Sequence, residues 1–555
     1  MLLDGNRYGH DDSIGHLGLT STETGGLPLH KRKLTPMMLH LVETSAPSIC
    51  GQPGLPERGL IGHVKFPASQ YAGDNFPSQF SYILSHNGIA QSHNLDIALA
   101  LHAAHQRHGN VVRIGFNHVS IATPEGLRTV YAHGNGFLKD IFYDAFVPHL
   151  PDVFTVRDRD EHARKRKLIT NAFSPGAVHD FEPYMAVNLE RWVAQLDRIA
   201  ASPGKDGYAK LDIRPWCTFL AFDIIGDLAF GAPFGMVERG RDEVQSTQPG
   251  GPATYVPGAE SLNRRGQVNN TLGWLPALRP WARYIPHPFF YKGLRSKANL
   301  HGIAVAAVER RLESVKESGT YQRRDILELL RRGKDAEGNP MPVDELIGEA
   351  HTQLVAGTDT VSNTSCAIIY WILEGERRNP GTILPRLLAE LDAAIRPGSA
   401  IAAHGEVKNL QFLRLCIDES MRLHSTSAMG LPRVVTGKDG ILCENEHFPE
   451  GTVLSVPSYT LHHNAEIWGP DVEEFKPERW LHATPQQKAS FNPFSHGPRA
   501  CVGQNVAHME MALIIGTAFY RYDFKLYQQT LQSHEGFMKK PAECWVGIKL
   551  RNNKA

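Results

Sequence analysis

Residues 494–503 have the composition of a loop that presents one reactive cysteine. They read Phe-Ser-His-Gly-Pro-Arg-Ala-Cys-Val-Gly, and an apolar helical run over residues 504–519 follows them. A thiolate must be kept ionised and aimed, and the N-terminus of a helix offers backbone N–H donors and a positive dipole for both tasks. The pattern therefore predicts that Cys501 is a metal-binding thiolate.

The residues around Cys501 favour a haem iron as that metal. Gly497 and Gly503 lack Cβ atoms, so they permit a tight turn and a close approach to a flat cofactor. Phe494 is placed to pack beside the sulfur, and Arg499 is placed to meet a negatively charged haem propionate. An ordinary buried cysteine is the alternative, but the spacing F-x-x-G-x-R-x-C-x-G is matched at all five fixed positions.

A second chemical motif, Ala-Gly-Thr-Asp-Thr over residues 356–360, lies inside a helical pattern that spans roughly residues 342–376. Glycine inside a helix costs about 1 kcal/mol relative to alanine. Ala356 and Gly357 would compensate by letting the helix pass flat over a haem, and the Thr360 hydroxyl would widen the groove for oxygen. Asp359 beside Thr360 forms an acid–alcohol relay that can deliver protons when an O–O bond breaks. An exposed aspartate beside an ordinary threonine is the alternative.

Two charged segments suit the scaffold of such a site. His162 and Arg166 are four residues apart, so they share one helix face from which both could donate to haem propionates. A solvated helix face is the simpler alternative for this charge run. Glu419 and Arg422 are three apart and can pair on one face of a further predicted helix.

Hydrophobic periodicity predicts a mainly helical chain with few strands. Residues 95–108 have helical spacing, whereas residues 111–114 and 118–121 alternate like the two strands of a hairpin. Residues 239–258 are dense in Gly, Pro, Thr and Gln, which predicts a mobile loop. Further helical patterns span roughly residues 179–200, 211–230, 291–317 and 324–333.

Together these motifs resemble the cytochrome P450 family over about residues 95–550. The resemblance implies a mainly α fold with small β-sheets, in which one large helical domain over residues 81–555 surrounds a buried haem. Residues 1–80, rich in Gly, His, Pro and Ser, predict a loop or disordered extension. The resemblance also adds Arg479 to the Glu419–Arg422 pair as a structural trio, and it makes Arg433 a further propionate ligand. By family position, the candidate substrate-pocket residues are Phe142, Phe146, Ala356, Met429 and Phe537.

The resemblance implies a monooxygenase that uses haem b, O2 and electrons from NADPH. The electrons would arrive through NADPH–cytochrome P450 reductase, with cytochrome b5 as a further candidate donor. Residues 142–147, 161–167, 223–235 and 279–286 resemble the fungal benzoate 4-monooxygenase branch, which implies hydroxylation of an aromatic acid or a related aromatic compound. Oxidation of a larger fungal secondary metabolite, a haem-thiolate isomerase or dehydratase that does not use O2, and a haem sensor are the alternatives.

Composition limits the partners and the compartment. Lys plus Arg and Asp plus Glu both number 58, so the zero net charge gives no general reason to bind nucleic acid. Arg164, Lys165 and Lys167 could still form a local cationic patch for an acidic electron donor. Seven cysteines without a C-x-x-C pair argue against a disulfide framework and favour an intracellular location. The family resemblance implies the endoplasmic reticulum membrane, although the first 80 residues contain no apolar run of about 20 residues.

Overall fold

The computed structural model describes residues 97–247, 252–318, 323–334 and 338–551. The predicted N-terminal extension lies outside the described residues. The α-helices are α3 (Ile97–His108), α4 (Pro124–Tyr131), α5 (Arg159–Thr170), α6 (Pro175–His179), α7 (Glu182–Ala200), α8 (Ile213–Phe230), α9 (Met236–Arg239), α10 (Gly258–Trp274), α11 (Pro288–Ser318), α12 (Ile326–Arg332), α13 (Val343–Arg378), α14 (Leu384–Ala394), α15 (His404–Val407), α16 (Gln411–Leu423), α17 (Ser458–His462), α18 (Ala465–Trp468), α19 (Pro485–Ser490) and α20 (Gln504–Arg521).

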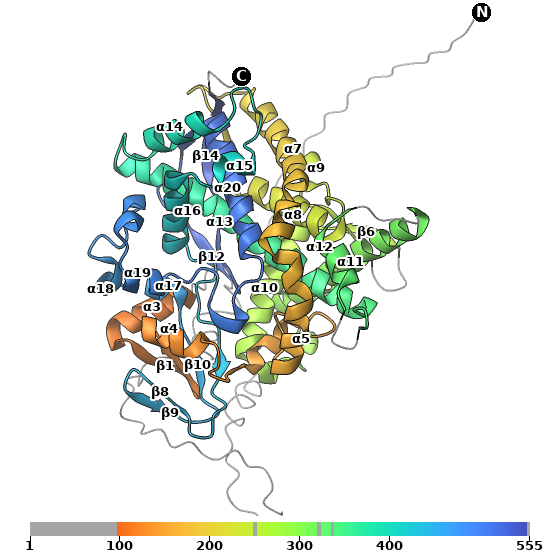
Figure 1. Ribbon diagram of the computed structural model, residues 1–555, viewed down its shortest axis with the longest axis vertical. Coiled ribbons are helices and arrows are strands. Elements are labelled where there is room, and N and C mark those ends of the chain that lie inside the picture. The colour runs from red at the N-terminus through yellow and green to blue at the C-terminus, as the bar shows by residue number, and fades with distance from the viewer. Residues whose placement is uncertain (1–96, 248–251, 319–322, 335–337, 552–555) are drawn as a thin grey trace, which may run out of the picture. The chain divides into compact units, whose positions relative to one another are not determined.

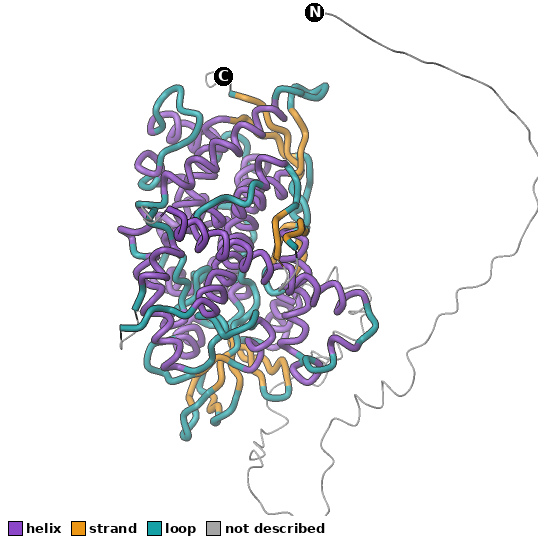
Figure 2. Tube along the Cα trace, turned by 90° about the vertical axis from the view of Figure 1, so that its right-hand side faces the viewer, coloured by secondary structure: helices purple, strands orange, loops and turns teal. Residues whose placement is uncertain are grey.

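Short 3-10 helices and strands connect these helices. The 3-10 helices are η1 (Ile141–Phe146), η2 (Asn171–Phe173), η3 (Pro276–Leu278), η4 (Ala282–Tyr284), η5 (Pro477–His482) and η6 (Gly497–Arg499). The strands are β1 (Val111–Gly115), β2 (His118–Ile121), β3 (Leu138–Lys139), β4 (Ala209–Asp212), β5 (Val244–Thr247), β6 (Ala253–Val256), β7 (Arg433–Val434), β8 (Ile441–Cys443), β9 (Glu446–Phe448), β10 (Val453–Ser455), β11 (Tyr522–Leu526), β12 (Ser533–Glu535), β13 (Lys539–Pro541) and β14 (Trp545–Leu550). Figure 2 shows helices as the bulk of the described chain, with the strands along one side and at one end.

The predicted helices and the predicted hairpin are present, because each follows a clear local pattern. α8 begins after Asp212, whose side chain accepts a hydrogen bond from the Arg214 backbone N–H, and ends at Gly231 with a φ of 83°. α5 begins after Asp158, whose carboxylate accepts from the Glu161 N–H at 2.8 Å. The region predicted as a mobile loop differs from the expectation, since β5 and β6 pair there as an antiparallel hairpin.

The largest sheet joins segments from distant parts of the chain. Its strand order is β1-β2-β10-β7-β3, with β2 and β10 parallel and the other neighbouring strands antiparallel. A second sheet has the order β11-β14-β4, and the remaining strands form two-stranded hairpins. The first sheet places β3 beside β7, so that Lys139 pairs with Arg433 in the register. This juxtaposition matters for the site described below.

Helix α13 runs through the middle of the helical part, beside α8, α16 and α20 (Figure 1). Its close approach to α8 explains Gly357, because a Cβ there would lie 2.8 Å from two side-chain carbons of Ile225. The main hydrophobic core surrounds this helix and includes Leu354, Ile368 and Ile369, none of which is exposed. None of the described helices combines the length and apolar character that a membrane span requires.

Candidate active site

A cavity lies between α13 and the loop that precedes α20. Nine of the residues predicted from the sequence line it: His162, Arg166, Ala356, Gly357, Thr360, Phe494, Arg499, Cys501 and Gly503. The structure describes six cysteines, all of them free. Cys501 is exposed, whereas the other five are buried. The structure therefore brings the predicted thiolate and the predicted oxygen-activating helix to one cavity.

The cysteine loop is held by a short turn. The backbone N–H of Cys501 donates to the carbonyl oxygen of Phe494 at 2.9 Å, and Gly503 is the residue that precedes α20. Gly497 adopts a φ of 70°, and a Cβ at this position would lie 1.8 Å from the carbonyl oxygen of Tyr131. The requirement for glycine at 497 is thus both conformational and steric.

The sequence predicts that the helix N-terminus keeps Cys501 ionised, but the surroundings of its sulfur favour the neutral thiol. Although the sulfur is exposed to the cavity, loss of hydration within the protein raises the pKa of this thiol, while the hydrogen bond from the Gly503 backbone and the charge of Arg166 act in the opposite direction. Loss of hydration outweighs these two contacts, so they do not by themselves keep the sulfur ionised. A metal cation bound to the sulfur would do so.

Five basic side chains cluster at the cavity; four of them line it, and Arg433 lies outside its lining. These are Lys139, His162, Arg166, Arg433 and Arg499, and their charges act on one another. Within the described ranges, none of the five forms an ion pair with a carboxylate. Burial and the four neighbouring cations lower the pKa of His162 to about 3, and burial together with Arg433 lowers that of Arg499 to about 10. A group with negative charges would relieve this repulsion, so the cluster fits the propionates of a haem.

Each arginine of this cluster is held by neutral oxygen atoms. Arg166 donates to the Ala500 carbonyl at 2.7 Å, and Arg499 donates to the Val156 carbonyl at 2.7 Å. Arg433 donates to the hydroxyl of Tyr143 at 2.8 Å. These contacts aim the guanidinium groups without neutralising them.

Sequence reasoning missed Lys139, although it lines the cavity. Its ammonium lies 4.3 Å from the ring centroid of Tyr143 and 4.2 Å from that of Phe154, and it donates to the Phe154 carbonyl. The available signal was a lone lysine within the apolar run Gly-Phe-Leu-Lys of residues 136–139. Such a lysine is buried only when a partner or a ligand favours it.

The acid–alcohol pair on α13 is split between two environments. Thr360 lines the cavity and its hydroxyl donates to the Ala356 carbonyl at 2.7 Å. Asp359 is absent from the lining; it is buried and its carboxylate lies 2.5 Å from the ammonium of Lys540 on β13. Asn363 also donates to the Asp359 carbonyl oxygen. Asp359 is thus not the exposed aspartate of the simpler alternative. Its carboxylate must separate from Lys540 before it can take up and pass on a proton.

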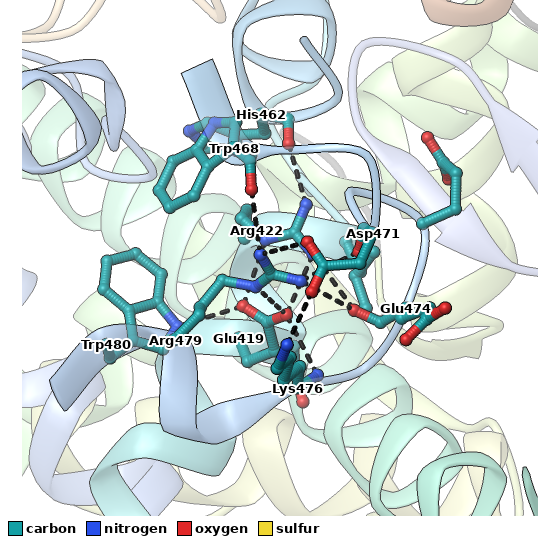
Figure 3. A network of polar contacts seen from close by, with 12 residues as sticks. Glu419, Arg422, His462, Trp468, Asp471, Glu474, Lys476, Arg479 and Trp480 are labelled. Carbon is teal, nitrogen blue, oxygen red and sulfur yellow. Dashed lines mark hydrogen bonds and ion pairs between the residues drawn. The ribbon is translucent and has the colours of Figure 1, made fainter. Parts of the chain in front are cut away.

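The Glu419 carboxylate stands at the centre of a buried polar network (Figure 3). It accepts from Arg422 at 2.9 and 3.0 Å and from Arg479 at 2.8 Å. The indole N–H of Trp480 also donates to it at 3.0 Å. The side chains of Glu419 and Arg422 are completely buried, and that of Arg479 is 6% exposed. Glu419, Arg422 and Arg479 therefore lie in contact, as the resemblance to the family implied.

This network reaches the cysteine loop by two routes. The ring of Trp480 packs on that of Phe491 with centroids 4.5 Å apart. Arg422 donates to the carbonyl of His462 at 2.8 Å, and the ring of His462 accepts from the backbone N–H of Asn492 at 3.1 Å. Residues 491 and 492 lie just before Phe494, so the network fixes the start of the loop.

The predicted substrate-pocket residues divide between the cavity and the layer beside it. Ala356 lines the cavity, but Phe142, Phe146, Met429 and Phe537 do not; they pack together in a separate hydrophobic cluster. Phe154 and Met538 line the cavity instead. The three phenylalanines form a layer behind this wall: their rings contact one another, and those of Phe146 and Phe537 also contact Phe154.

The predicted cationic patch also differs from the expectation. Lys165 is buried and lies 2.5 Å from Glu345 and 3.3 Å from Glu349, both on α13. Arg164 lies 2.7 Å from Glu161 and 2.5 Å from Glu345. Only Lys167 of the three is exposed. Two of the three charges therefore tie α5 to acidic side chains and are not free for docking.

Comparison with known proteins agrees with this geometry. The cytochrome P450 family model matches residues 77–544. Benzoate 4-monooxygenase bphA of Aspergillus niger is 49% identical over 457 residues, which cover 81% of this chain and 87% of that protein. Cytochrome P450 monooxygenase poxM of Penicillium oxalicum is 28% identical over 78% of this chain and 80% of its own length. Cytochrome P450 monooxygenase cicH of Emericella nidulans is 27% identical over 81% of this chain and 88% of its own length.

Proposed function

Because this chain belongs to the cytochrome P450 family, we propose that it is the monooxygenase of an aromatic carboxylic acid and that it hydroxylates the ring of benzoate or a close analogue. The observation that carries this proposal is the high identity to benzoate 4-monooxygenase along most of both chains. Benzoate is therefore the first substrate to test.

The residues of the site have distinct tasks in this proposal. A haem, when bound, supplies oxygen activation. Cys501 would bind its iron, and the five clustered basic residues, four of which line the cavity, would bind its propionates. Phe494 would restrict water beside the sulfur, and its ring also packs edge-on against His508. Thr360 would hold a proton donor in the cavity, with Asp359 as the acid behind it.

Electrons would come from NADPH through NADPH–cytochrome P450 reductase, with cytochrome b5 as a second possible donor. The expected location is the endoplasmic reticulum membrane, where the reductase would be met. The weak docking patch on α5 means that other basic residues would have to bind this partner.

The proposal is tested by reconstituting the haem-loaded protein with a fungal reductase, NADPH and benzoate. We expect 4-hydroxybenzoate, identified by chromatography and mass spectrometry, and no product when NADPH or oxygen is left out. Substrate-dependent conversion without NADPH and oxygen would instead favour an isomerase or dehydratase. Turnover of larger aromatic compounds but not of benzoate would favour the secondary-metabolite alternative.

Thr360→Ala should separate electron use from product formation. Without the hydroxyl, protons reach the oxygen less selectively, so we expect the product formed per NADPH to fall about tenfold and hydrogen peroxide to rise. Thr364→Ala is the matched control, because Thr364 also lines the cavity on α13 while its hydroxyl is within 2.9 Å of that of Thr426. Equal coupling in the wild type and Thr360→Ala would remove Thr360 from the relay.

A further inference from the structure

One face of α10 carries buried hydrogen-bond donors that have no acceptor. Arg265 is 7% exposed, and its Nε has no partner among the described residues. The one hydrogen bond that it makes within the described part of the chain is long, 3.3 Å from a terminal nitrogen to the Phe146 carbonyl. Asn269 is 1% exposed, and its side-chain nitrogen also lacks a partner within the described ranges. The two residues are four apart, so they share one helix face.

The residues of α10 next to this face lie against the layer behind the cavity wall. Next to Arg265, Gly266 faces the backbone nitrogen of Phe537, which a Cβ at Gly266 would approach to 3.9 Å. Next to Asn269, Asn270 donates to the Gly536 carbonyl at 2.9 Å. The neighbouring residue in that segment, Met538, lines the cavity.

Aromatic rings connect Arg265 to the same cavity from its other side. Phe146, whose carbonyl accepts from Arg265, has its ring centroid 4.6 Å from that of Phe537 and 6.3 Å from that of Phe154. Phe154 lines the cavity. The guanidinium therefore contacts the backbone of a residue whose ring packs against the cavity wall.

The nearby acids are already engaged. Asp152 and Asp359 are close enough to act electrostatically on Arg265. Asp152, however, accepts hydrogen bonds from the backbone of Phe154 at 2.9 Å and Thr155 at 2.8 Å, and Asp359 is paired with Lys540. Neither acid lies within ion-pair distance of the guanidinium. Burial lowers the pKa of Arg265 to about 10, so this side chain remains charged at neutral pH.

A buried guanidinium without an acidic partner is costly unless an anion meets it. The basic cluster that suits the haem propionates does not include Arg265, so this charge is left for another anion. We propose that Arg265, helped by Asn269, binds the carboxylate of the aromatic substrate and directs the ring past Phe154 into the cavity of Cys501. Guanidinium and carboxylate groups match in planar, two-point hydrogen bonding. This inference rests on the proposed function, which supplies the aromatic acid.

Arg265 could alternatively serve only to hold η1. Lys297 of α11 donates to the Ala145 carbonyl at 3.4 Å, next to the Phe146 carbonyl that Arg265 contacts. Both cations therefore suit the C-terminal end of η1. Lys297→Met is therefore the control for losing one hydrogen bond from a cation to the end of η1.

The test compares benzoate with benzamide, its neutral isostere, by spectral titration and calorimetry on the haem-loaded protein. In Arg265→Met we expect the Kd of benzoate to rise on the order of 100-fold and that of benzamide to change less than about threefold. Arg265→Lys should retain part of the preference for benzoate. Lys297→Met, which also removes a positive charge close enough to act on Arg265, should weaken benzoate binding far less than Arg265→Met does.

Asn269→Asp provides a second variant that preserves the fold. The new carboxylate would pair with Arg265 and compete with the substrate, so benzoate binding should weaken while benzamide binding and the melting temperature are maintained. Equal losses for benzoate and benzamide in Arg265→Met, or an unchanged preference in both variants, would overturn the anchor alone. A wild-type protein that binds benzoate no better than benzamide would overturn the aromatic-acid proposal and the anchor with it.

Discussion

Cys501→Ser is expected to abolish the carbon monoxide difference band of haem-thiolate ligation in the reduced protein. Cys501 is the one described cysteine exposed to the cavity, and a serine hydroxyl cannot replace a thiolate as the ligand that donates electrons to the iron. Product formation should fall by at least about a thousandfold, which corresponds to roughly 4 kcal/mol.

The measurement is a difference spectrum of the dithionite-reduced protein with and without carbon monoxide, recorded at equal haem content. Cys443→Ser is the control, since Cys443 is buried on β8 and does not line the cavity. Its spectrum should match that of the wild type. A thiolate-type band that persists in Cys501→Ser would show that another ligand binds the iron, and the proposed site would fail.

Local patterns explain why the cysteine loop could be predicted from the sequence. Within residues 494–503 the requirements are set by the backbone itself: Gly497 has a positive φ beside the Tyr131 carbonyl, and Gly503 directly precedes α20. The capped helices and the hairpin of β1 and β2 likewise follow from neighbouring residues. Interactions between residues close in sequence are therefore enough to predict the cysteine loop, these helices and this hairpin.

The rest depends on partners that are distant in sequence. Lys540 meets Asp359 only because β13 folds back toward α13, and Lys139 joins the basic cluster only because β3 pairs with β7. Helix α10 was not predicted, since part of its buried face is polar, with Arg265 and Asn269, so it lacks the apolar period of an ordinary helix. A polar face that becomes buried is itself a sign of a ligand site, as proposed above for Arg265.

Removing the Glu419 charge is expected to be the most destabilising change outside the cavity. Glu419→Gln leaves Arg422 and Arg479 buried without their counter-charge, and breaking such a pair costs about 3–5 kcal/mol. Because Trp480 and His462 connect this network to residues 491 and 492, the variant should also bind haem less firmly. We expect a lower denaturant midpoint and a larger share of haem-free protein.

The matched control for Glu419→Gln is Lys476→Met, which removes a surface ion pair of the same network. Lys476 lies 2.8 Å from Asp471, but its side chain is 53% exposed, so the loss should stay below about 1 kcal/mol. Both variants are compared with the wild type by urea unfolding, followed by circular dichroism and by haem absorbance. Similar midpoints for Glu419→Gln and Lys476→Met would mean that the buried trio does not stabilise the fold. A drop confined to Glu419→Gln, seen earlier by haem absorbance than by circular dichroism, would place its effect at the loop that precedes Cys501.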